Sequence, residues 1–133
     1  MLEWNIAAGW FGMVVGTVLG MWYGMYAESR EWAGGYGSFR RQTLRLAHIA
    51  AFALGIINVL YGLCGTGSLW PYEWLGIAGS VAMIAGGLLM PVVCLLAAWR
   101  NSFKYLFPIP ASCVLVGVGV QAWSWLVVAW GGM

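Results

Sequence analysis

Charged side chains are scarce in this chain, and their scarcity excludes most soluble folds. Only 8% of the 133 residues are Asp, Glu, Lys or Arg, while 62% are hydrophobic. A soluble domain carries about a quarter charged residues. The few basic residues lie beside apolar segments and form no patch that could follow a nucleic-acid backbone. The composition therefore predicts a membrane protein that does not bind nucleic acid.

The chain also lacks the residues from which an active site is usually built. Its four acidic residues all lie at the ends of apolar segments or in loops, so none can orient the single histidine, His48. The three cysteines are widely spaced and odd in number, which does not predict a disulfide framework. The N-terminus has no basic region that would mark a cleaved signal peptide. We expect no enzymatic activity.

The sequence gives little more support for a transport function than for an enzymatic one. Proton-coupled transporters usually relay protons through a carboxylate inside the membrane, and no apolar segment here contains one. Asn58, Gln121 and Ser124 could line a narrow polar path, so a small oligomeric channel or carrier stays an alternative.

Four apolar segments are each long enough to cross a bilayer, which takes about 20 residues. They cover residues 4–26, 43–64, 74–99 and 105–130. The sequence thus predicts an all-α integral membrane protein, a four-helix antiparallel bundle that forms one domain over residues 1–133.

The basic residues predict how this bundle is oriented. All six fall in or beside the connecting segments 27–42 and 100–104, and none lies near the other loop or the termini. Basic loops stay on the cytoplasmic side of a membrane. We therefore expect these two loops in the cytoplasm and both termini on the outer, periplasmic side of a bacterial inner membrane.

Glycine recurs at four-residue steps in the first segment. The residues expected to pack against a neighbouring helix or a partner are Gly12, Gly16, Gly20, Gly24, Asn58 and Gly62. Residues four apart lie on nearly the same helix face. In lipid, such a stripe lets another backbone approach closely, which drives helix association.

Polar residues of the second segment also share a face. His48 and Asn58 lie inside the membrane, where side chains of this kind turn toward other helices or a cavity. One interpretation is that both make interhelical hydrogen bonds. The other makes His48, together with Arg45, part of a site for a haem, a chlorin or a quinone. Because His48 is the only histidine, two histidines of this chain cannot ligate one haem.

Two further sets of residues suggest ligands. Thioether, thiol and imidazole groups suit Cu(I), and they recur near the inner ends of the helices at Met21, Met25, His48, Met90 and Cys94. Arg40 and Arg41 begin the second helix, where the helix dipole disfavours positive charge. Anionic lipid head groups or an acidic partner would compensate them.

The leading functional hypothesis is a small accessory or scaffold subunit of a larger membrane complex. Glycine-rich helix surfaces and the lack of a catalytic set support it, and other transmembrane subunits are the expected partners. Respiratory or photosynthetic electron-transfer assemblies are the class that we would examine first. No cofactor is required by the sequence. Binding of a haem, chlorin, quinone or Cu(I) is the main alternative.

Overall fold

The structure, a computed structural model, consists of helices joined by short connections. It describes residues 1–65 and 73–131, and within these ranges it contains no strand. The elements are α1 (Leu2–Ala27), η1 (Trp32–Gly34), α2 (Phe39–Cys64), α3 (Glu73–Trp99), η2 (Asn101–Leu106) and α4 (Pro108–Gly131). Four of the helices are long and apolar enough to cross a membrane. The predicted all-α fold with four such helices is confirmed.

Two helix boundaries differ by three residues or more from those expected. α2 begins at Phe39, four residues before the predicted start at residue 43. The cause is local, because the Ser38 side chain accepts a hydrogen bond from the Arg41 backbone N–H at 3.2 Å and so caps the helix. α4 begins at Pro108 instead of residue 105, since the preceding residues form the 3₁₀ helix η2. The predicted loop between the second and third spans lies mostly outside the described residues.

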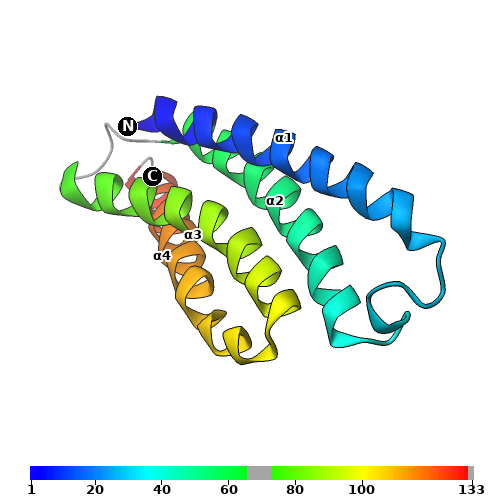
Figure 1. Ribbon diagram of the computed structural model, residues 1–133. Coiled ribbons are helices and arrows are strands. Elements are labelled where there is room, and N and C mark those ends of the chain that lie inside the picture. Colours follow the sequence, from blue (N-terminus) through cyan, green and yellow to red (C-terminus); the bar gives the residue numbers. More distant parts are fainter. Residues whose placement is uncertain (66–72, 132–133) are drawn as a thin grey trace.

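The helices run alternately up and down, and each packs against the next one along the chain (Figure 1). α3 packs against α2 on one side and α4 on the other, and it touches α1 less extensively. α4 therefore lies at the edge of the arrangement. The start of α1 and the end of α4 lie at the same end of the molecule (Figure 1).

Small residues bring α1 and α2 together over most of their length. A methyl group built on Gly16 would lie 2.8 Å from the Phe52 backbone nitrogen, and one on Gly12 would lie 3.2 Å from the Ala51 carbonyl oxygen. On α2, a methyl group on Gly55 would lie 2.7 Å from the Gly9 carbonyl oxygen. These backbones could not approach so closely if the glycines carried side chains.

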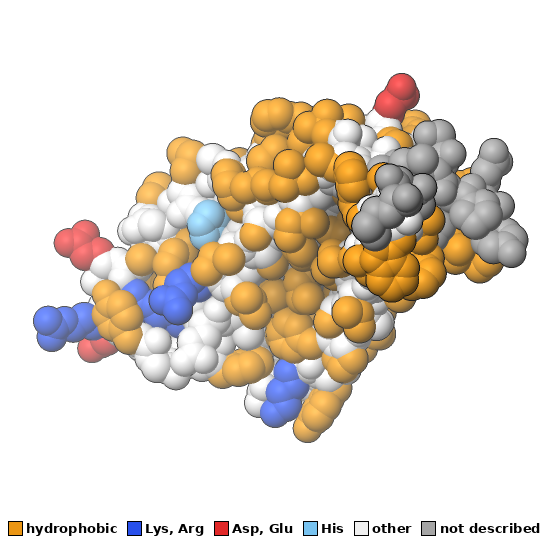
Figure 2. Space-filling view, turned by 180° about the vertical axis from the view of Figure 1, so that it is seen from behind, with side chains coloured by type: hydrophobic (Ala, Val, Ile, Leu, Met, Phe, Trp, Pro, Cys, Tyr) orange, Lys and Arg blue, Asp and Glu red, His pale blue; other side chains and the backbone are white. Residues whose placement is uncertain are grey.

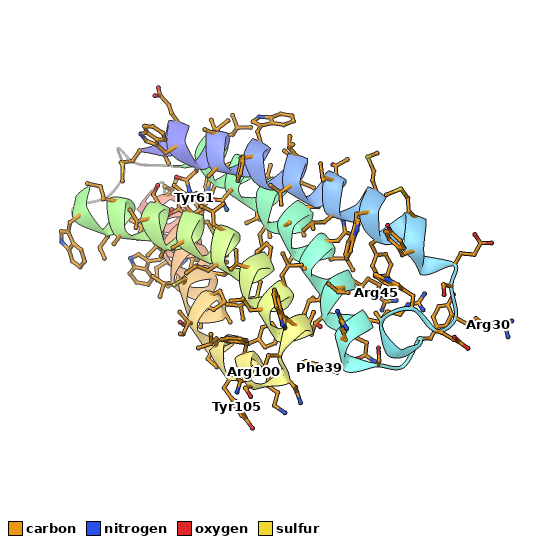
Figure 3. The ribbon with its side chains drawn as sticks, in the orientation of Figure 1. Arg30, Phe39, Arg45, Tyr61, Arg100 and Tyr105 are labelled. Carbon is orange, nitrogen blue, oxygen red and sulfur yellow. The ribbon has the colours of Figure 1, made fainter. Side chains whose placement is uncertain are left out.

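Charge and apolar surface are separated along the molecule. The side chains of Arg30, Arg45 and Arg100 lie toward the end opposite the termini (Figure 3). Figure 2 shows that hydrophobic side chains cover most of the visible face, with the basic ones confined to one end and the adjoining edge. This distribution suits a helix bundle whose flanks contact lipid.

Candidate functional site

A buried polar cluster joins the first three helices near the ends that lie beside the chain termini. It consists of Asn5 on α1, Asn58 on α2 and Ser80 on α3, each at most 2% exposed. The Asn5 amide donates to the Asn58 side-chain oxygen at 3.2 Å and to the Ser80 carbonyl at 3.3 Å. The Ser80 hydroxyl donates in return to the Asn5 side-chain oxygen.

Every hydrogen of the two amides in this cluster is used. Asn58 donates to the carbonyl oxygens of Leu54 and Met83, at 3.1 and 3.2 Å. A network in which each donor has an acceptor holds the helices together. The interhelical interpretation of Asn58 therefore fits its observed contacts. The sequence analysis did not single out Asn5, because a polar residue near the start of an apolar segment is usually taken to mark where that segment begins.

Arg41 turns into the protein and does not face lipid. It is 2% exposed, and its guanidinium donates to the Ser29 carbonyl at 3.1 Å and to the Ala27 carbonyl. Its Cζ also lies 3.8 Å from the centre of the Tyr36 ring. The sequence led us to expect that Arg41 contacts lipid head groups or an acidic partner. Its burial inside the protein shows that this expectation is wrong. Arg40 is exposed and stays a candidate for that contact.

The position of Arg41 explains how its charge is tolerated at the start of α2. Ala27 is the last residue of α1, and the C-terminal end of a helix favours a cation. The guanidinium therefore satisfies carbonyl groups at the end of one helix while it sits at the start of the next. The chain reverses between them through Ala33, Gly34 and Gly35, all with positive φ.

His48 lies against the glycine surface of α1. Its Nδ1 is 2.7 Å from the Gly16 carbonyl oxygen. A methyl group on Gly20 would lie 2.5 Å from the imidazole Cε1, so this glycine makes room for the ring. His48 also lines a groove of 510 Å³ between α1 and α2, whose other lining residues are Thr17, Gly20, Ile49, Phe52, Ala53 and Ile56.

The other glycines of the predicted packing set differ in their surroundings. A methyl group on Gly62 would lie 2.7 Å from the Leu2 carbonyl oxygen, so Gly62 also faces α1. A methyl group on Gly24 would meet no atom within 4 Å. Gly12, Gly16 and Gly20 thus pack against α2 of the same chain, whereas Gly24 faces outward.

The proposed copper ligands are divided between the surface and the interior. Met21 and Met25 are 68% and 71% exposed on α1, whereas Cys94 on α3 is fully buried. Among residues 1–65 and 73–131, no three His, Cys, Asp or Glu side chains lie close enough to hold a metal ion. The predicted set, which also includes Met90, is thus divided between exposed residues of α1 and a buried residue of α3.

The residues of the possible polar path are bound to backbone groups. Gln121 donates to the Cys64 carbonyl at 3.0 Å, and the Ser124 hydroxyl donates to the Gln121 carbonyl at 2.7 Å. Asn58 belongs to the separate cluster with Asn5 and Ser80. The three side chains therefore serve different contacts.

Comparisons of the chain with protein-family models, with curated proteins and with solved structures found no match.

Proposed function

We propose that the protein is a membrane-embedded subunit that binds another transmembrane helix through α4. The main support is the narrow contact that α4 makes with its own chain. In its most apolar stretch 11% of the residues are buried, against 17% in α1, 33% in α2 and 44% in α3. The buried ones that are described, Pro110, Gly117 and Ser124, lie seven residues apart and form one seam.

Two glycines of α4 distinguish its inner and outer faces. A methyl group on Gly117 would lie 2.9 Å from the Met83 Cβ, so Gly117 is needed where α4 meets α3. A methyl group on Gly119 would meet no atom within 4 Å. Glycine in a helix interior is about 1 kcal/mol less favourable than alanine in water. A close contact with a helix of another subunit would give Gly119 a packing role.

Photo-crosslinking from α4 tests this proposal. A photoreactive amino acid replaces Leu115, which is 72% exposed on α4, or Val18, which is 59% exposed on α1. In native membranes we expect Leu115 to give a discrete adduct with another membrane protein, and Val18 to give lipid adducts. Gly119→Leu should abolish the Leu115 adduct. Lipid adducts alone from Leu115, or an adduct with a second copy of this chain, would contradict the proposed subunit role.

Respiratory and photosynthetic electron-transfer assemblies are the first class in which to search for this partner. The choice rests on how often such assemblies contain small helical subunits. Affinity purification in a mild detergent, followed by identification of the cross-linked protein, tests it. A partner without any redox role would remove this assignment and leave the subunit proposal in place.

We further propose that the basic end of the bundle faces the cytoplasm of a bacterial cell. The support is the placement of all six basic residues in or beside the α1–α2 and α3–α4 connections. Alkaline phosphatase fused to the C-terminus should be active, because this enzyme folds outside the cytoplasm, and a fluorescent protein fused there should be dark. The reverse result would invert the orientation.

A further inference from the structure

His48 presents one nitrogen with a fixed proton and one with a free lone pair. A carbonyl oxygen only accepts hydrogen bonds, so Nδ1, 2.7 Å from the Gly16 oxygen, must carry the proton. In the neutral ring Nε2 then has no proton and can only accept a hydrogen bond or ligate a metal. A histidine that ligates a metal is usually fixed in this way, with its other N–H on a carbonyl.

Nε2 has no partner among residues 1–65 and 73–131, yet it is accessible. The one hydrogen bond of the His48 side chain in these ranges is that of Nδ1, and Nε2 is not among the buried atoms left without a partner. Figure 2 shows the histidine side chain at the surface. The groove offers it no donor, since the Thr17 hydroxyl donates to the Met13 carbonyl at 2.8 Å. A ligand that engages Nε2 in this groove would therefore have to bring a metal or a hydrogen-bond donor.

A cationic groove adjoins the apolar one. It has a volume of 350 Å³ and is lined by Tyr23, Tyr36, Arg41, Gln42, Arg45, Leu46 and Ile49. Ile49 lines both grooves, so the two adjoin at this residue of α2. Arg45 lies three residues before His48, on the same helix face and one turn nearer the basic end. Arg41 is held by backbone carbonyls, whereas Arg45 is exposed.

We propose that this double groove binds a haem-type metalloporphyrin with carboxylate side chains. The Nε2 lone pair of His48 would ligate the metal while Nδ1 keeps its proton on Gly16, so binding releases no proton from the ring. The apolar groove takes the macrocycle, and Arg45 pairs with a carboxylate at the basic end. His48 supplies the one imidazole ligand that the chain contains.

Other amphiphiles satisfy fewer of these groups. An anionic phospholipid offers Arg45 a phosphate, but its acyl chain brings neither a metal nor a donor to Nε2. A quinone carbonyl is itself an acceptor and cannot bond an unprotonated nitrogen. A quinol hydroxyl could donate to Nε2, but it gives Arg45 no counter-charge. The metalloporphyrin alone among these ligands matches the lone pair, the apolar walls and the cation.

Titration of the purified full chain in detergent with ferric haem tests the proposal. We expect one haem per chain and a shifted Soret band typical of imidazole ligation. His48→Ala should lose this band, and added imidazole should restore it. Arg45→Gln should weaken binding about tenfold, the loss expected for a charge-assisted hydrogen bond. Arg100→Gln removes the same charge at the end of α3 and should bind haem normally.

A second variant protects the test against misfolding. Thr17 is exposed on the groove wall, so Thr17→Phe should block the groove while His48 stays in place. Circular dichroism and gel-filtration volume check the fold of each variant. Haem binding that is absent in the wild-type chain, or that stays at the wild-type level in His48→Ala or Thr17→Phe, overturns the proposal. A quinol analogue that binds through His48 in place of haem also overturns it. None of these results depends on a partner at α4.

Discussion

The α1–α2 pair and the α3–α4 pair both rely on glycine for close approach, but they differ in their polar contacts. A methyl group on Gly86 of α3 would lie 2.9 Å from the Val114 backbone nitrogen of α4. The corresponding distance from Gly16 of α1 to the Phe52 backbone nitrogen of α2 is 2.8 Å. Hydrogen bonds cross or flank the α1–α2 interface from Asn5 to Asn58, from His48 to the Gly16 carbonyl and from Arg41 to the Ser29 carbonyl. Among the described residues, α4 sends one such bond to another helix, from Gln121 to Cys64.

This difference indicates how the molecule is assembled. The Asn5–Asn58–Ser80 cluster ties α1, α2 and α3 into one unit, since unsatisfied polar groups in lipid are unfavourable. The fourth helix is attached by packing along a single seam. A loosely attached edge helix is free to contact another subunit, whereas a helix held by polar bonds on several sides is not.

The largest effect should come from filling the α1–α2 contact. Gly16→Leu places a side chain against the Phe52 backbone, which cannot move aside, and should lower the free energy of unfolding by about 3 kcal/mol. Gly24→Leu is the matched control and should change it little, because Gly24 faces open space. Unfolding by SDS in mixed micelles measures both. Equal losses would mean that α1 does not pack on α2 through this face.

The polar cluster should give the next largest effect. Asn58→Leu leaves the Asn5 amide and the Met83 carbonyl without their partner, and should cost about 2 kcal/mol in the same unfolding assay. Asn5→Leu should lower the free energy of unfolding by less in the Asn58→Leu variant than in the wild-type chain, because the two amides share one network. Strict additivity would refute that coupling. Ser112→Ala, which removes a bond within α4, should be nearly neutral.

The Arg41 contacts should affect the connection between α1 and α2 more than the whole fold. Arg41→Gln removes the bonds to Ser29 and Ala27, so residues 28–38 should open more often. Tryptic cleavage after Arg30 should accelerate several-fold, with a loss of global stability of about 1 kcal/mol. Arg40→Gln, at an exposed neighbour, should leave the cleavage rate unchanged. Equal rates in both variants would contradict the assigned role of Arg41.

The smallest effect should come from the one polar bond of α4. Gln121→Leu removes its exposed hydrogen bond to the Cys64 carbonyl and should change the free energy of unfolding by about 0.5 kcal/mol or less. A loss as large as that of Asn58→Leu would show that α4 is held as firmly as the other helices. The contrast between the two pairs would then fail.

The spans and their glycine spacing were predictable, but the pairing of individual residues was not. Helical periodicity places Gly12, Gly16 and Gly20 on one face of α1, yet it does not say which helix covers that face. Asn5 and Asn58 are 53 residues apart in the chain, and no local pattern connects them. The inward turn of Arg41 was missed because charge near a predicted boundary usually faces head groups.

The sequence by itself determined that this chain forms membrane-length helices and gathers its positive charge at one end. Both follow from composition and spacing, because hydropathy and helix length act locally. Tertiary structure alone decided that α2 covers the glycine face, that Asn5 belongs to a buried network, and which nitrogen of His48 is free. These depend on contacts between distant segments, where a backbone carbonyl such as that of Gly16 selects the tautomer of a side chain on another helix.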